Sequence, residues 1–237
     1  MARAAIVLQA RMGSSRLPGK SLARIGDRSL LAHCVERLRL ATRLPVIVAT
    51  TTLAEDDAVE AEAARLLAPV VRGSATDVLS RYLLAADAFG LSHLVRATAD
   101  NPAVDWEGAD RAFQALVETA ADHVVEGGLP IGAGVEAMTV WALRRSARLT
   151  QAPYDREHVT PHLRRTPGFR ALITPAPRTL QRPHLRLTVD TEADLLFMRQ
   201  LHGALGEPAA SAPAPLGAII AMARRLTTGR AMAGALR

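Results

Sequence analysis

Segments typical of buried β-strands alternate along most of this chain with segments whose apolar residues recur at helical spacing. Strand patterns occur at Ala4–Ala10, Val46–Thr50, Val70–Arg72, His93–Thr98 and Leu185–Val189. Helical patterns occur at Ser29–Leu40, Asp56–Leu67, Ala75–Phe89, Trp106–Glu118 and Trp141–Thr150. Such an alternation favours a mostly parallel, twisted sheet with helices on both faces. We therefore predict a single-domain, Rossmann-like α/β fold over residues 1–205.

Two regions break this alternation. Gly127–Thr139 is rich in glycine, whose backbone can approach a ligand closely, so we expect a flexible rim near a second substrate. Residues 206–215 are rich in proline and alanine, which predicts a linker, and Leu216–Leu226 predicts a final helix. We accordingly predict that residues 206–237 form a linker and a C-terminal helix outside the main domain.

The composition limits the classes of protein to consider. Of the 237 residues 49% are hydrophobic, yet no apolar run approaches the ~20 residues that span a bilayer. A single cysteine, Cys34, excludes an internal disulfide and a cysteine-based metal site. The first strand pattern begins within a few residues of Met1, which leaves no room for a signal peptide, so we expect a cytoplasmic protein.

The net charge of +6 raises the possibility of nucleic-acid binding. Aromatic residues make up only 3% of the chain, however, so platforms on which bases stack are scarce. The arginines are dispersed along the sequence. We interpret the charge as suited to small anionic substrates, without a nucleic-acid or membrane partner; a steep salt dependence of DNA or RNA binding would support the alternative.

The loop after the first strand pattern is rich in groups that bind phosphate. Its cations, glycines and hydroxyls are Arg11, Gly13, Ser14, Ser15, Arg16, Gly19 and Lys20. Exposed amide N–H groups, hydroxyls and cations in one loop suit a polyphosphate. The residue order matches neither GxxxxGK[ST] nor GxGxxG. Lys20 is the only lysine among the 29 basic residues, which suggests a position that needs a compact ammonium group.

Polar loops also follow the third and fourth strand patterns. In open sheets of this type, ligands bind beyond the carboxyl ends of the strands. Gly73, Ser74 and Asp77 follow the third strand, but they are equally typical of a capped helix start. Asp100 follows the fourth strand, where a carboxylate can hold a divalent cation or can belong to a simple Asp-Asn-Pro turn. These residues alone leave both alternatives open.

Several segments together resemble one enzyme family. They read QARMGSSRLPGK at 9–20, RGSATDVLSRY at 72–82, RATADNP at 96–102, REHVTPH at 156–162 and DTEADL at 190–195. They are similar to motifs of the cytidylyltransferases, which include the 3-deoxy-manno-octulosonate and acylneuraminate enzymes. The resemblance is greatest to the group called spore coat polysaccharide biosynthesis protein F-like. It extends over roughly residues 4–205 and implies the nucleotide-diphospho-sugar transferase fold.

The resemblance implies transfer of CMP from CTP to a phosphate, phosphonate or sugar-acid acceptor, with release of pyrophosphate. Mg²⁺ would be the cofactor, held by Asp100 and Asp190, and the pathway would build activated sugars for surface glycans or related natural products. A homodimer is implied as well, with residues of about 127–175 inserted for acceptor binding and dimerisation.

The roles that the resemblance assigns fall into three groups. Residues implied in catalysis are Lys20, Arg11 and Arg16. Residues implied in nucleotide binding are Gln9, Ala10, Gly13, Ser14, Ser15, Gly73, Ser74, Asp77, Arg96 and Asp100. Residues implied in acceptor binding are Glu136, Arg156, Glu157 and His158.

Three positions depart from the family motifs. Ala99 stands where many relatives have glycine, Gly134 where many have the aspartate of G-x-D-V-E, and His162 where they have tyrosine. The missing aspartate leaves the acceptor open. A glycosyltransferase and a nucleotidyltransferase that prefers another base, such as UTP or GTP, stay as alternatives. A glycosyltransferase usually carries a D-x-D metal motif, and none follows a strand pattern here.

Overall fold

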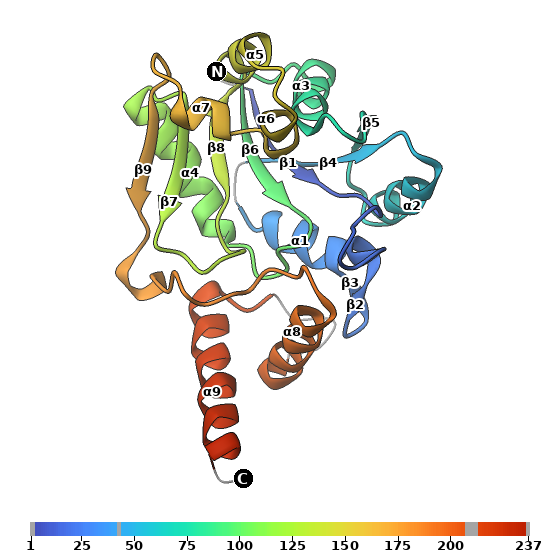
Figure 1. Ribbon diagram of the computed structural model, residues 1–237, viewed down its shortest axis with the longest axis vertical. Coiled ribbons are helices and arrows are strands. Elements are labelled where there is room, and N and C mark those ends of the chain that lie inside the picture. The colour runs from blue at the N-terminus through green and yellow to red at the C-terminus, as the bar shows by residue number, and fades with distance from the viewer. Residues whose placement is uncertain (1–2, 42–43, 207–212, 236–237) are drawn as a thin grey trace.

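A seven-stranded sheet forms the centre of the computed structural model, which describes residues 3–41, 44–206 and 213–235, except for the side chains of 228–235 (Figure 1). In spatial order the strands are β5 (Val70–Gly73), β4 (Val46–Thr51), β1 (Ala4–Gln9), β6 (His93–Thr98), β8 (Glu136–Thr139), β7 (His123–Gly127) and β9 (Ala171–Pro175). All neighbours run parallel except β8, which is antiparallel to β6 and β7. The predicted mostly parallel sheet is confirmed.

Helices cover both faces of this sheet, because successive residues of a strand point to opposite sides. From β1, Ile6 and Leu8 pack with the apolar residues of α1 (Leu30–Leu38), α2 (Asp57–Arg65) and α4 (Trp106–Thr119). Ala5 and Val7 of the same strand belong to the cluster that contains α3 (Val78–Phe89), α5 (Val140–Leu149) and α7 (Pro161–Arg165). Burial on both faces explains the uninterrupted apolar run of β1.

A third apolar cluster lies below the sheet, where α8 (Glu192–Leu205) and α9 (Leu216–Ala235) pack side by side (Figure 1). It also receives residues from α1 and from the hairpin of β2 (Arg24–Ile25) and β3 (Arg28–Ser29). The remaining elements are the helix α6 (Pro153–His158), which packs on α3, and the 3-10 turns at Lys20–Leu22, Ala54–Asp56 and Arg178–Leu180.

The strand predicted at Leu185–Val189 is wrong. This segment makes a single isolated bridge, between Arg186 and Ile131, and does not join the sheet. Its alternating pattern nevertheless reflects burial, because Leu187 and Val189 both enter the third cluster. Their backbone N–H groups donate to loop carbonyls, that of Ile131 and that of Asp100, rather than to a neighbouring strand.

Other boundaries also differ from the sequence predictions. The glycine-rich region predicted as a rim contains β8 and the end of β7, and β9 lies further along in the segment of about 127–175. Helix α3 begins at Val78 rather than Ala75, because Asp77 caps it. Helix α9 extends to Ala235 instead of ending at Leu226.

The C-terminal predictions are covered only in part. Most of the predicted linker, residues 207–212, lies outside the described residues. The domain boundary at residue 205 and the role of residues 127–175 as an insertion stay predictions. In the described part of the chain, no helix combines the length and the apolarity that crossing a membrane requires.

Candidate active site

A cavity of about 300 Å³ lies at the carboxyl ends of β1 and β6, between the loop after β1 and helices α3 and α6. It brings together predicted site residues that are far apart in the sequence: Gln9, Ala10, Arg11, Gly13, Ser14, Ser15, Arg16, Lys20, Arg96, Asp100, Glu157, His158 and Asp190. The other predicted residues are not among those that line it: Gly73, Ser74, Asp77, Glu136 and Arg156.

The loop after β1 is held in place by backbone contacts and one buried acid. The Met12 N–H donates to Asp56 Oδ1 at 2.6 Å, and the Gly19 N–H donates to the Met12 carbonyl at 2.9 Å. Gly19 has a φ of 73°, a left-handed conformation that favours glycine. The hydroxyl of Ser21 donates to the Arg11 carbonyl at 2.8 Å and closes the loop. The fold thereby presents the polar side of this loop to the cavity.

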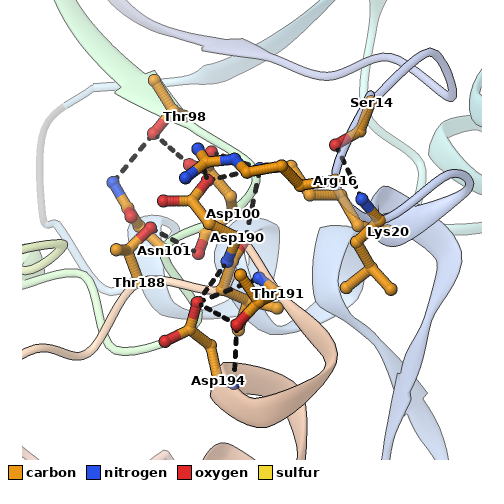
Figure 2. Close-up of polar contacts among 12 residues, drawn as sticks. Ser14, Arg16, Lys20, Thr98, Asp100, Asn101, Thr188, Asp190, Thr191 and Asp194 are labelled. Atoms are coloured by element: carbon orange, nitrogen blue, oxygen red, sulfur yellow. Dashed lines mark hydrogen bonds and ion pairs between the residues drawn. The ribbon is translucent and has the colours of Figure 1, made fainter.

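Lys20 connects the two acids predicted to hold a metal. Its Nζ lies 2.9 Å from Asp100 Oδ2 and 3.0 Å from Asp190 Oδ1, and it also donates to the Val189 carbonyl at 3.2 Å. Figure 2 shows Asp100 and Asp190 beside each other, although they come from the end of β6 and from the segment before α8. Two carboxylate oxygens therefore converge within reach of one small cation.

Both acids are oriented by further contacts (Figure 2). Asp100 Oδ1 accepts from the Thr98 hydroxyl at 2.6 Å. Arg186 donates to Asp190 Oδ2 at 2.6 Å, and Arg16 lies 3.1 Å from Asp190 Oδ1. Burial alone would raise the pKa of Asp190, but the hydrogen bonds from Lys20 and Arg186 outweigh it and lower this pKa. Asp190 is thus held as a carboxylate at neutral pH.

Asp190 also depends on the start of α8. Thr191 and Asp194 form a reciprocal cap: the Thr191 hydroxyl accepts from the Asp194 N–H at 3.2 Å, and Asp194 Oδ2 accepts from the Thr191 N–H at 2.9 Å. The same carboxylate oxygen accepts from the Asp190 N–H at 3.0 Å. This cap fixes the backbone that carries Asp190.

Glu136 lies behind the wall of the cavity, on the antiparallel strand β8. Its carboxylate pairs with Arg96 at 3.2 Å and accepts from the Thr160 hydroxyl at 3.3 Å, while His123 lies 3.9 Å away. Burial opposes ionisation, but the His123 imidazole and the Arg96 guanidinium outweigh it and lower the pKa of Glu136 to about 2. This carboxylate therefore orients Arg96, which itself lines the cavity.

The residues predicted around the start of α3 have structural partners. Asp77 caps the helix by accepting from the Ser80 N–H at 2.9 Å, and the Ser74 hydroxyl accepts from the Asp77 N–H at 3.0 Å. Arg156 lies 3.6 Å from Asp77. The capped-helix alternative thus describes their contacts, and their roles toward the nucleotide and acceptor stay predictions.

On the α6 side, Glu157 and His158 reach the cavity. Arg11 lies 3.6 Å from Glu157 and donates to the Ala75 carbonyl at 3.1 Å, so it bridges α6 and the loop before α3. The His158 ring packs against that of Tyr154 with centroids 4.4 Å apart.

Some lining residues were not predicted from the sequence: Ser21, Val78, Arg81, Thr98 and Ala99. Thr98 could have been found, because it precedes Asp100 by two residues at the end of a strand. Arg81 and Val78 stand within the quoted segment RGSATDVLSRY, but only the way in which α3 packs places them at the cavity.

The sequence as a whole matches known proteins. The family model described as Cytidylyltransferase matches residues 4–206. The chain belongs to the cytidylyltransferase family. The spore coat polysaccharide biosynthesis protein SpsF of Bacillus subtilis is 35% identical over 209 residues, 85% of this chain and 87% of that protein. A 3-deoxy-manno-octulosonate cytidylyltransferase of Solibacter usitatus is 36% identical over 114 residues, which is 47% of this chain and 44% of that protein.

The fold of this cytidylyltransferase is also shared with a solved structure. A cytidylyltransferase of Leptospira borgpetersenii superposes with a TM-score of 0.88 at 28% identity, over 96% of each chain. The predicted family and α/β fold are therefore confirmed, and the chain is a nucleotidyltransferase. The alternative of a glycosyltransferase is not supported.

Proposed function

We propose that this cytidylyltransferase joins CMP from CTP to a small anionic acceptor, a phosphate, a phosphonate or a sugar acid, with release of pyrophosphate. The observation that carries the proposal is the convergence of Asp100 and Asp190 on Lys20 within one polar cavity. The product class is an activated sugar or related precursor of surface glycans, as the similarity to SpsF suggests. Homodimerisation and a cytoplasmic location stay predictions.

The residues present fit a divalent cation. Magnesium binds one or two carboxylates and completes its shell with phosphate oxygens and water. Asp100 and Asp190 supply two carboxylates, and the described residues contain no group of three or more His, Cys, Asp or Glu side chains that could hold a metal alone. We therefore assign Mg²⁺ to Asp100 and Asp190 together with the triphosphate; when bound, it neutralises phosphate charge.

In the reaction, an acceptor oxygen attacks the α-phosphorus of CTP; a phosphate or phosphonate attacks as its anion, whereas a sugar hydroxyl gives up its proton to water. The new oxygen–phosphorus bond forms as the bond to the bridging oxygen breaks, and pyrophosphate leaves with the electron pair. No protein nucleophile is required, so the protein contributes alignment and charge stabilisation. Lys20 and Arg11 stabilise charge on the phosphate oxygens, and Arg16 stabilises the leaving group. The N–H groups near Gly13–Ser15 hold the phosphates.

The test is release of pyrophosphate from CTP with a panel of sugar acids, sugar phosphates and phosphonates, with and without Mg²⁺. We expect release that depends on both acceptor and cation. Asp100→Asn and Asp190→Asn should each weaken the response to Mg²⁺. If both variants keep the parental Mg²⁺ response, the metal assignment is wrong; if no acceptor in the panel supports release, the proposed reaction is wrong.

A further inference from the structure

Arg81 is a cavity residue that forms no ion pair with any described side chain. It lies on α3, lines the cavity and is only 1% exposed. Its Nε and Nη1 atoms are buried and have no hydrogen-bond partner among the described residues. A charged group that is removed from water without a partner destabilises the folded protein. Such a group at the wall of a ligand cavity points to a partner supplied by the ligand.

The other guanidinium and ammonium groups of the cavity differ from Arg81 in this respect. Each is paired with an acid: Arg11 with Glu157, Arg16 with Asp190, Lys20 with Asp100 and Asp190, and Arg96 with Glu136.

The two acids whose charge acts on Arg81, Asp56 and Asp77, have other partners: Asp56 accepts from the Met12 N–H, and Asp77 accepts from the Ser80 N–H. Among the described cations that line the cavity, Arg81 alone has no ion pair.

The end of β5 is shaped to admit this side chain. A Cβ atom on Gly73 would lie 2.9 Å from Arg81 Cγ, closer than packed carbon atoms approach each other. A larger residue at position 73 would therefore displace the Arg81 stem. This contact gives Gly73, which does not line the cavity, an indirect role in positioning Arg81.

The sheet order separates the Arg81 stem from the strand that precedes Asp100. The stem lies beside the end of β5, whereas Asp100 follows β6, and the intervening strands are β4 and β1. Three inter-strand spacings correspond to about 14 Å. If the triphosphate lies at Lys20, as the proposed function requires, the nucleoside lies toward α3. Val78, one helical turn before Arg81, adds an apolar surface there.

We propose that Arg81 recognises the pyrimidine edge of the nucleotide and selects cytosine over uracil; this rests on the proposed function. Cytosine offers two adjacent acceptors, O2 and N3, to the parallel N–H groups of a guanidinium. Uracil carries N3–H, so a donor would face a donor. Arg81 thus gives a physical basis for the base preference, which the sequence by itself left open.

The experiment measures binding without turnover. Titration calorimetry compares CMP, UMP and pyrophosphate on the parent, Arg81→Met and Arg81→Lys, with Arg170→Met as a control at an exposed arginine outside the cavity. We expect the parent and control to prefer CMP to UMP. Arg81→Met should weaken CMP by about 10- to 100-fold and reduce the CMP/UMP ratio, the scale of a lost bidentate base contact. Arg81→Lys should also lose the preference for CMP over UMP. In both variants the affinity for pyrophosphate should stay within about twofold of the parental affinity.

An equal loss of CMP and pyrophosphate binding would overturn the proposal, because Arg81 would then serve the phosphates. Unchanged CMP binding, or a parent without base preference, would overturn it as well. Thermal unfolding separates recognition from folding. Without nucleotide, Arg81→Met should melt at or above the parental temperature, since a buried unpaired charge is removed, and its CMP-induced rise should shrink.

A lower melting temperature without nucleotide would instead show that Arg81 supports the fold. If Arg81→Met does not fold, Arg81→Lys carries the same comparison. The binding ratio is measured without an acceptor, so an absence of pyrophosphate release would refute the proposed reaction without deciding the role of Arg81.

Discussion

At the scale of single residues, the one lysine of the site and its arginines make different kinds of contact. The arginines donate hydrogen bonds to single carboxylates: Arg96 donates to Glu136, and Arg186 donates to Asp190. Lys20 supplies a compact ammonium between two carboxylates that come from distant parts of the chain. A guanidinium is planar and presents its donors as a fixed fork, whereas the ammonium is a compact charge that reaches both oxygens from one atom.

Replacing Lys20 should therefore reduce catalysis directly. We expect Lys20→Ala to lose ~2–4 kcal/mol of transition-state stabilisation, the usual scale for a preorganised charged group. The measurement is kcat/KM for pyrophosphate release, with an exposed arginine variant, Arg39→Ala, as the control. Turnover close to that of the parent would remove Lys20 from the mechanism.

The same contacts predict how metal binding responds to Lys20. Because the ammonium occupies the space between Asp100 and Asp190, a divalent cation must displace it in the protein without nucleotide. We expect weak Mn²⁺ binding to the nucleotide-free parent and tighter binding to Lys20→Met, since the ammonium between the two carboxylates is then gone and Asp100 loses its ion pair, while Arg16 and Arg186 still contact Asp190. Titration of free Mn²⁺ by electron paramagnetic resonance measures this.

The control is the double variant Lys20→Met with Asp190→Asn, which should bind Mn²⁺ more weakly than Lys20→Met alone. Equal Mn²⁺ affinity of the parent and Lys20→Met would contradict the idea that lysine and metal share one position.

At the scale of elements, the segment of residues 185–189 shows how an irregular stretch carries a site residue. It is held by backbone hydrogen bonds to Ile131 and Asp100, and it delivers Asp190 to the cavity. Gly132 has a φ of 90°, and a Cβ there would lie 2.6 Å from the Thr188 backbone nitrogen. The segment of residues 185–189 therefore packs directly against the backbone of the glycine-rich stretch at Gly132.

Gly132→Ala should accordingly damage both stability and activity. The added Cβ pushes the segment of residues 185–189 away, and the left-handed φ is strained for alanine. We expect a lower melting temperature and a lower kcat/KM. Gly203→Ala is the matched control, because a Cβ there meets nothing within 4 Å and alanine favours the helix α8 by up to ~1 kcal/mol. Equal behaviour of the two variants would refute this role of Gly132.

At the scale of the whole molecule, carboxylates in three different parts of the fold share a depressed pKa. Glu136 lies on β8, Asp155 on α6 and Asp194 on α8, and the pKa of each is lowered to about 2. Burial opposes this for Glu136 and Asp194, while the Arg165 hydrogen bond is the largest influence on Asp155. Their stabilising effect is fully present above the unfolded pKa, near ~4.

The free energy of unfolding should therefore fall as the pH drops from ~4.5 to ~2, because these carboxylates bind protons in the unfolded chain at a higher pH than in the folded chain. Glu136→Gln should be less stable than the parent at neutral pH, and the difference should narrow across this window. Melting temperatures of both proteins against pH test this. Parallel curves would mean that Glu136 is not responsible for the acid sensitivity.

How much could be predicted from the sequence differs between the sheet and the site. Periodicity located β1, β4, β5 and β6, most clearly β1 and β4, whose burial on both faces leaves continuous apolar runs. It missed β7, β8 and β9; β9 lies at the sheet edge, and none of its residues is buried. It also assigned a strand at Leu185–Val189, because alternating burial looks the same whether or not a neighbouring strand is present.

By itself the sequence determined the α/β class and the family, and it predicted phosphate binding by the loop after β1, because these depend on local pattern and on order along the chain. Only the tertiary structure decided which side chains meet: that Lys20 lies between Asp100 and Asp190, and that Arg81 reaches the cavity without an ion pair to any described residue. The physical reason is that pairing between distant segments depends on strand order and helix packing. Neither is written in any short stretch of residues.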